Sequence, residues 1–79
     1  MLSELPEAFG EVLRAHRAHK KWSQMKLANE AGLHLNQIGN LERGKRSPSL
    51  QTVFLLAKAL KVPAAEIVAA VERIKPKIM

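Results

Sequence analysis

Three amide side chains, Asn36, Gln37 and Asn40, lie close together in the chain. An amide carries a donor and an acceptor side by side, so it can form two hydrogen bonds with the edge of adenine. Asn36 and Asn40 have i, i+4 spacing and would share one face of a helix, with Gln37 beside Asn36. Lys45 and Arg46 follow, and such cations bind phosphate. This combination favours binding to nucleic acid.

Two residues beside the amides have more than one interpretation. Leu35 precedes Asn36 near the start of the expected helix. It could contact a thymine methyl group or pack against Leu33 and the turn, and the sequence leaves both open. Gly39 lowers helix propensity by up to about 1 kcal/mol relative to alanine. Its small size could allow a close approach to DNA or to another helix, or it is simply tolerated.

The amides fall in the second half of a stretch, residues 24–43, that is typical of two short helices around a glycine-centred turn. Ser23 is a good N-cap for the first helix. Gly32 tolerates the left-handed backbone that the turn needs. Ile38 and Leu41 give the second helix an apolar edge at i, i+3 spacing. The stretch therefore predicts a helix-turn-helix.

Three further helices are expected around this unit. The first spans roughly residues 6–20 and begins at Pro6, whose missing N–H costs nothing in a first turn. The fourth follows the N-cap Ser49; it is the most apolar, and its broad face indicates burial against several neighbours. The fifth runs from residue 64 to 74, and residues 1–5 and 75–79 are expected to be loose. The sequence predicts an all-α fold, a compact bundle of five helices.

Composition limits the class of partner. The 79 residues suffice for a single domain spanning residues 1–79. Thirteen Lys and Arg stand against seven acidic residues, none of them aspartate, for a formal charge of +6. This balance favours a polyanion, with nucleic acid ahead of an anionic membrane, although charge alone fits a merely basic protein equally well. No apolar run approaches the length of a membrane span, and we expect a cytoplasmic, nucleoid-associated protein.

Catalytic and metal-binding groups are not evident. Cysteine is absent, which excludes disulfides, thiolate zinc sites and thiol catalysis. No Ser/His/Asp grouping, paired carboxylates or glycine-rich phosphate loop occurs. His16 and His19 are spaced i, i+3, but no third ligand lies nearby, and His16 falls on an apolar face. We therefore expect no enzyme activity, no metal and no cofactor.

Phosphate contacts are expected on both sides of the amides. Gln24 and Ser23, at the start of the first helix of the pair, can offer side-chain groups and backbone N–H groups to a phosphate. Arg43 ends the second helix, and Lys45 and Arg46 follow on a loop. A solvated loop is the alternative for these last two residues, and their place beside the amides argues against it.

An ordered set of motifs resembles the XRE/Cro/C1-type helix-turn-helix family over roughly residues 9–71. The matching motifs are Ser23-Gln24, Leu27-Ala28, Ala31-Gly32-Leu33, Ile38, Leu41-Glu42-Arg43-Gly44, Pro48-Ser49-Leu50 and Ala57-Lys58-Ala59-Leu60-Lys61-Val62. The resemblance implies a lambda-repressor-like DNA-binding domain with a structural ion pair between Arg17 and Glu42. It also implies a phosphate contact by Gln24 and a set of groove-facing residues: His34, Leu35, Asn36 and Asn40.

The function implied is a sequence-specific transcription regulator that binds a palindromic operator in double-stranded DNA as a homodimer. Small restriction–modification controller proteins and phage repressors, which often act on their own promoters, are similar in size. The last helix is the expected dimer interface, through whichever of its four large apolar residues the core does not use; the alternative is that all four are core. These residues are Ile67, Val68, Val71 and Ile74.

Two other functions remain open. The first is an antitoxin-type protein, which would bind DNA and also mask a toxin. The second is a protein-interaction module that no longer binds DNA. An acidic or apolar replacement of the amide-bearing face would be expected for such a module, and Asn36, Asn40, Lys45 and Arg46 argue against it.

Overall fold

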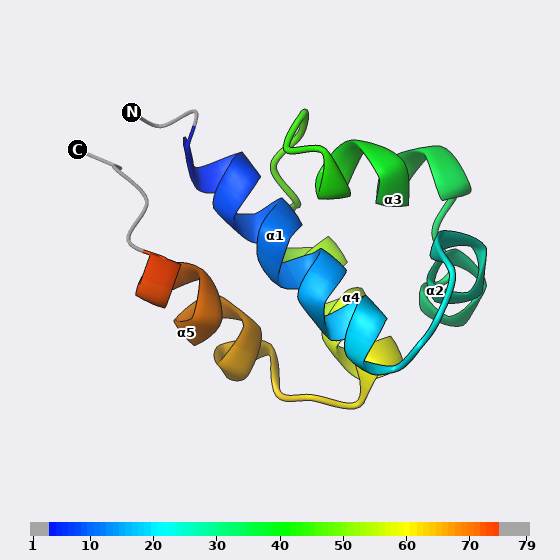
Figure 1. Cartoon of the computed structure of the whole chain (residues 1–79). Coiled ribbons are helices and arrows are strands. Elements are labelled where there is room, and N and C mark those ends of the chain that lie inside the picture. The colour runs from blue at the N-terminus through cyan, green and yellow to red at the C-terminus, as the bar shows by residue number, and fades with distance from the viewer. Residues whose placement is uncertain (1–3, 75–79) are drawn as a thin grey trace.

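Five helices make up residues 4–74, the part of the chain that the computed structural model describes (Figure 1). Within this part there is no strand, so the predicted all-α bundle of five helices is confirmed. The expectations for Met1–Ser3 and for residues 75–79 lie outside the described residues. The helices are α1 (Glu4–His19), α2 (Gln24–Ala31), α3 (Leu35–Glu42), α4 (Leu50–Leu60) and α5 (Ala64–Ile74).

The start of α1 corrects the sequence prediction. The helix begins at Glu4 instead of Pro6, so Glu4 and Leu5 are helical and not loose. Pro6 is still compatible with this start, because the first four N–H groups of any helix lack an intrahelical acceptor and a proline there removes no bond. Glu4 and Glu7 place negative charge in the first turn, where the helix dipole favours it.

Local side-chain chemistry sets the ends of the other helices. Ser23 Oγ accepts a hydrogen bond from the backbone N–H of Lys26 across 3.0 Å, and Ser49 Oγ accepts one from Thr52 N–H, also across 3.0 Å. Gly32 has a φ of 71° and ends α2 in the left-handed conformation. Both serine N-caps and the glycine turn predicted from the sequence are therefore confirmed.

Helix α1 runs through the middle of the molecule, with α3 on one side and α5 on the other (Figure 1). Helix α2 packs against α3 and α4, and α4 also contacts α5. At eight residues each, α2 and α3 are too short to be stable alone, so their folding depends on a shared core. All five helices contribute to it. The fully buried large side chains are Leu13, Leu27, Ile38, Leu56, Leu60 and Ile67.

Helix α4 is less completely buried than its composition suggests. Val53, Leu56 and Leu60 lie in the core, but Leu50 is 71% exposed and Phe54 is 58% exposed. The prediction of burial is therefore wrong for Leu50 and Phe54. Helix α4 packs mainly against α2 and α5. Its apolar residues are spread over several faces, so the sequence could not identify which side those helices cover.

Two glycines allow the end of α3 to lie directly on α1. A β-carbon on Gly10 would lie 2.6 Å from the carbonyl oxygen of Leu41 and 2.7 Å from that of Glu42. Gly44, with a φ of 74°, lies against Glu7, and a β-carbon on it would be 2.9 Å from the Glu7 α-carbon. The backbone of α1 thus positions the C-terminal end of the amide-bearing helix.

Candidate nucleic-acid interface

The outer face of α3 presents the polar residues that the sequence singled out. Asn36 and Gln37 are exposed and Asn40 is half-buried, whereas Ile38 and Leu41 on the opposite side are buried in the core. Because buried Ile38 and Leu41 fix the rotation of α3 about its axis, the three amides must face outward. Asn36 and Asn40 lie one turn apart on that face.

The amides differ in their hydrogen bonds within the protein. Gln37 Oε1 accepts a hydrogen bond from the backbone N–H of His34 across 3.0 Å. Asn40 Oδ1 accepts one from Arg43 Nη2 across 2.9 Å. Among residues 4–74, the Asn36 side chain makes no hydrogen bond to another protein group. Asn36 therefore keeps both its donor and its acceptor for an external partner.

The start of α3 bears on the two interpretations of Leu35. Leu33 packs against the core, while Leu35 is 40% exposed and is not part of the core. His34 is exposed and occupies the N-cap position in an extended conformation. Leu35 thus lies on the outside of the turn, where its side chain is available to a methyl group or another apolar partner.

Gly39 lies beneath the side chain of Arg43. A β-carbon on Gly39 would lie 3.0 Å from Arg43 Nη1. Its backbone is ordinary helix, because the two glycines with positive φ are Gly32 and Gly44. The nearest group to Gly39 is therefore the guanidinium of Arg43, the C-cap of α3, and not another helix. A close approach of Gly39 to DNA stays a prediction.

A hollow of about 410 Å³, lined mainly by polar residues, opens between α3 and the start of α4. Asn36, Gln37 and Asn40 line it from one side, Arg46–Ser49 from the connecting loop and Thr52 from α4. The hollow therefore joins the three amides to a cation and to several hydroxyl groups. Amides, hydroxyl groups and cations are the side-chain types that contact nucleic acid.

The loop after α3 begins with a tight turn that orients its cations. Gly44 adopts the left-handed conformation, and the backbone N–H of Lys45 donates to the carbonyl oxygen of Asn40 across 2.9 Å. Lys45 and Arg46 follow directly and are both exposed. The turn thus keeps two positive charges at the C-terminal end of the amide-bearing face.

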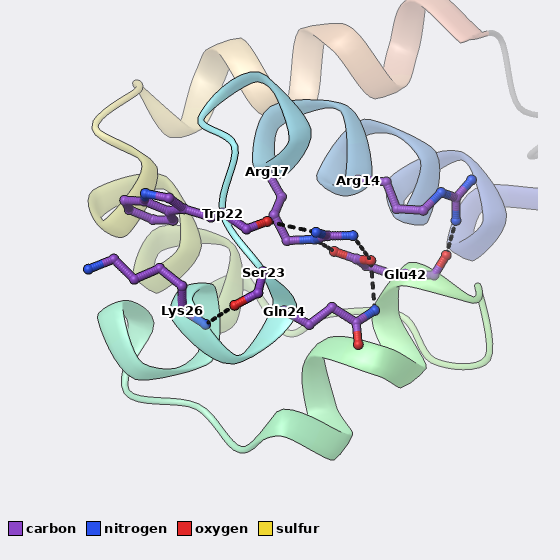
Figure 2. Close-up of polar contacts among 7 residues, drawn as sticks. All are labelled: Arg14, Arg17, Trp22, Ser23, Gln24, Lys26 and Glu42. Atoms are coloured by element: carbon purple, nitrogen blue, oxygen red, sulfur yellow. Dashed lines mark hydrogen bonds and ion pairs between the residues drawn. The ribbon is translucent and has the colours of Figure 1, made fainter.

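Ser23 and Gln24, expected to contact phosphate, also have structural roles. Gln24 Nε2 donates a hydrogen bond to Glu42 Oε1 across 2.9 Å, which links α2 to the end of α3 (Figure 2). Ser23 Oγ caps α2. Each side chain retains one further donor, the second amide hydrogen of Gln24 and the hydroxyl hydrogen of Ser23, and these remain available for a phosphate.

Glu42 is the centre of a buried polar network (Figure 2). Its side chain is 2% exposed and accepts two hydrogen bonds from Arg17, from Nε across 2.6 Å and from Nη2 across 3.0 Å. The ion pair expected from the family resemblance is therefore present. Arg14 donates to the Glu42 backbone carbonyl, and Arg17 Nη1 donates to the Trp22 carbonyl across 2.8 Å. Together these bonds fasten α1 and its following turn to α3.

The hydrogen bond from Arg17 to the Glu42 carboxylate raises the pKa of Arg17 above its ordinary value. The negative charge of Glu42 also raises the pKa, while partial burial lowers it. A raised pKa means that the stabilising contribution of the arginine is fully present below its ordinary pKa and is lost only in strongly alkaline solution. The pair therefore persists across the neutral range.

Sequence reasoning missed several contacts that depend on tertiary packing. Arg14 and Gln24 both bind Glu42, and no motif indicated this, because the three residues come from different helices. Trp22 is half-buried against the core, with Lys20 Nζ 5.4 Å and Lys26 Nζ 5.6 Å from its ring centre. Only the short sequence separation of these lysines from Trp22 could have suggested the cation–π contacts.

Helix α5 divides its apolar residues between the core and the surface. Ile67 and Val71 are buried, whereas Val68 is 53% exposed and Ile74 is 41% exposed. The core thus uses two of the four residues considered for a dimer interface and leaves two. Val68 also lines an apolar hollow of about 220 Å³ together with Leu5, Phe9 and Val53.

No grouping of three His, Asp or Glu side chains within residues 4–74 could hold a metal ion. His16 is half-buried and His19 is exposed, and neither forms part of such a group. In the same described part, every helix is too short or too polar to cross a lipid bilayer.

Comparison with known proteins decides the family. A helix-turn-helix family model matches residues 13–67, more than half of the chain and including all of α2, α3 and α4. The chain belongs to the helix-turn-helix family. The resemblance to its XRE-type members, inferred from the ordered motifs, is thereby confirmed. The outward amides of this helix-turn-helix protein lie on α3, the second helix of the motif.

Its relatives include controller proteins of restriction–modification systems. The protein is 40% identical to the control protein C.SmaI of Serratia marcescens over 57 residues, which cover 72% of this chain and 68% of the relative. It is 40% identical over 63 residues to the control protein C.BamHI of Bacillus amyloliquefaciens, covering 78% of each chain. The crystal structure of the controller protein C.AhdI from Aeromonas hydrophila is 39% identical and superposes with a TM-score of 0.76, covering 78% of this chain and 94% of that one. This helix-turn-helix protein is therefore a DNA-binding transcription regulator and not an enzyme.

Proposed function

We propose that this helix-turn-helix protein binds a palindromic operator as a homodimer and regulates transcription by recognising base pairs with α3. The observation that carries the proposal is the set of outward amides on α3, Asn36, Gln37 and Asn40, which line a hollow together with Arg46. A major groove admits one α-helix, and amides on its outer face can form paired hydrogen bonds with base edges.

The distribution of charge also supports binding with α3 facing the DNA. The formal charge of +6 provides a general attraction to a polyanion. Lys45 and Arg46 follow α3, and the start of α2, with Ser23 and Gln24, lies on the other side of the motif. Contacts from both places to the sugar–phosphate backbone would fix the position of α3 in the groove without specifying sequence.

A dimer through α5 would leave the recognition surface free. In Figure 1, α5 and α3 lie on opposite sides of α1. The exposed Val68 and Ile74 of α5, with Phe54 of α4, supply apolar surface that a partner copy could cover. Two copies of α3 would then contact half-sites about 34 Å apart, one turn of DNA, on a palindromic operator.

The similarity to control proteins supports a role as a controller protein. The alternative role within the same family is that of a phage-type repressor. The operator would then lie in the promoter of the gene for this protein, so that the protein regulates its own synthesis. Such a regulator would act in the cytoplasm, at the nucleoid. Binding to the DNA upstream of its own gene, measured against an unrelated duplex of equal length, tests this autoregulation.

Selection from a pool of random duplex DNA tests the proposed function as a whole. Purified protein is incubated with the pool at moderate salt, and the retained duplexes are sequenced. A palindromic consensus with half-sites one helical turn apart would support a dimeric regulator. Retention of DNA with no consensus, even at low salt, would contradict sequence-specific binding and would favour a protein partner such as a toxin.

A further inference from the structure

The side-chain oxygen of Asn40 accepts a hydrogen bond from Arg43. The hydrogen bond between Arg43 Nη2 and Asn40 Oδ1 is 2.9 Å long. An arginine carries only donors, so the amide atom that faces it must be the oxygen and not the nitrogen. The acceptor of Asn40 is therefore directed at Arg43, and the two N–H donors of its amide point elsewhere.

Gly39 provides the space for this contact. The Arg43 guanidinium lies over the Gly39 α-carbon, where a β-carbon would be 3.0 Å from Nη1 and 3.6 Å from Cζ. Since the backbone of Gly39 is ordinary helix, its conformation does not require glycine, and space for the arginine is what the missing side chain supplies. Arg43 can thus fold back along α3 and reach Asn40 one turn before it.

We propose that Gly39, Asn40 and Arg43 form one base-recognition unit that selects guanine over adenine at one base pair of each half-site. This inference rests on the proposed function. In the major groove adenine presents the N7 acceptor and the N6 donor, and a bidentate contact with it needs the amide oxygen. Guanine presents two acceptors, N7 and O6. The N–H donors of Asn40 and of the adjacent guanidinium match guanine, and the cation beside Oδ1 opposes the N6 amino group of adenine.

The two asparagines on this face are therefore not equivalent. Asn36 makes no hydrogen bond within the described part of the chain and keeps both groups that adenine requires. Asn40 sits one turn further along α3, and one of the two lone pairs of its oxygen accepts from the Arg43 guanidinium, whose positive charge opposes a second donor there. The half-site should accordingly contain an adenine contact from Asn36 and a guanine contact from Asn40.

Four variants of the full chain test the inference in the random-duplex selection. Asn40→Ala identifies the base pair that Asn40 contacts, because the base preference at that pair alone should weaken. Arg43→Met keeps an unbranched stem but removes every donor. Gly39→Ala retains all charges and polar groups and adds one methyl group, for which the guanidinium must shift away from its place over residue 39. Arg73→Gln is the matched control, since it removes one arginine charge from an exposed site on α5, on the other side of α1 from α3.

The wild type should enrich guanine at the base pair identified by Asn40→Ala. Arg43→Met should lower the ratio of guanine to adenine there by about tenfold, and Gly39→Ala should lower it in the same direction. Arg73→Gln should leave the ratio unchanged. Three results would overturn the inference: adenine at that pair in the wild type, no pair affected by Asn40→Ala, or an unchanged ratio in Arg43→Met. In each of these cases a palindromic consensus would still support the proposed function. A wild type with no consensus would overturn both.

Discussion

The α-carbon of Gly10 in α1 faces the carbonyl oxygen of Leu41 in α3, with room for a hydrogen atom but not for a methyl group. A β-carbon there would lie 2.6 Å from that oxygen, closer than real β-carbons approach. Both neighbouring groups are backbone, so neither can rotate away as a side chain could. The position of α3, and with it the direction of the amides, depends on this contact.

Gly10→Ala should therefore destabilise the protein. Overpacking against the α3 backbone should lower the free energy of unfolding by about 1–3 kcal/mol, measured by denaturant titration. Gly39→Ala is the matched control, because it is also a glycine within a helix but meets only the flexible end of Arg43. It should be neutral or raise the stability by up to about 1 kcal/mol. Equal stability of the two variants would contradict the proposed role of Gly10.

The Arg17–Glu42 pair should contribute strongly to the stability of the fold. Arg17→Met leaves the Glu42 carboxylate buried at 2% exposure without its principal cation. The free energy of unfolding should fall by about 3–5 kcal/mol. The double variant Arg17→Met/Glu42→Leu removes both charges, so its loss should be smaller than the sum of the two single losses. Additive losses would mean that the pair has no coupling energy.

The helix-turn-helix was predictable because its signals are local. Ser23 and Ser49 cap their helices through their own hydroxyl groups, and Gly32 supplies a left-handed turn that other residues rarely adopt. The start of α1 was less certain, because a proline such as Pro6 is tolerated anywhere in the first turn. The outward direction of the amides followed from the periodicity of Ile38 and its neighbours.

Contacts that depend on how helices cross could not be predicted. The exposure of Leu50 and Phe54 is set by which side of α4 meets α2 and α5. The bond from Gln24 to Glu42 requires the ends of α2 and α3 to meet. The contact of Arg43 with Asn40 is local, but it depends on a side-chain conformation that residue spacing alone does not define.

Arg46 is expected to contact phosphate. Arg46→Gln should weaken binding to every duplex, and the slope of log K against log salt should decrease in magnitude by about 0.9 for each protomer, about 1.8 for the proposed dimer. Arg73→Gln is the control, because it removes the same charge from an exposed site on α5. Fluorescence anisotropy at several salt concentrations measures both slopes. Identical slopes for the two variants would exclude a phosphate contact by Arg46.

Val68 is expected to lie in the dimer interface. Val68→Lys places a charge on the exposed surface of α5 and should raise the dimer dissociation constant by at least about tenfold, with the fold intact. Analytical ultracentrifugation measures this constant. Met25→Lys is the comparison, since Met25 is similarly exposed at 51% but lies on α2. If the two changes weaken the dimer equally, or if neither weakens it, the interface does not include Val68.

Sequence-specific recognition by the outer face of α3 is tested most directly by Asn36→Ala. Asn36 is exposed and makes no hydrogen bond within residues 4–74, so its removal should leave the fold unchanged. Binding to the selected consensus and to a scrambled duplex is measured at the same salt concentration, with Asn29→Ala on α2 as the matched control. We expect Asn36→Ala to weaken binding to the consensus by about 1–3 kcal/mol and to leave binding to the scrambled duplex unchanged. Equal weakening on both duplexes, or no weakening on either, would contradict recognition of bases by α3.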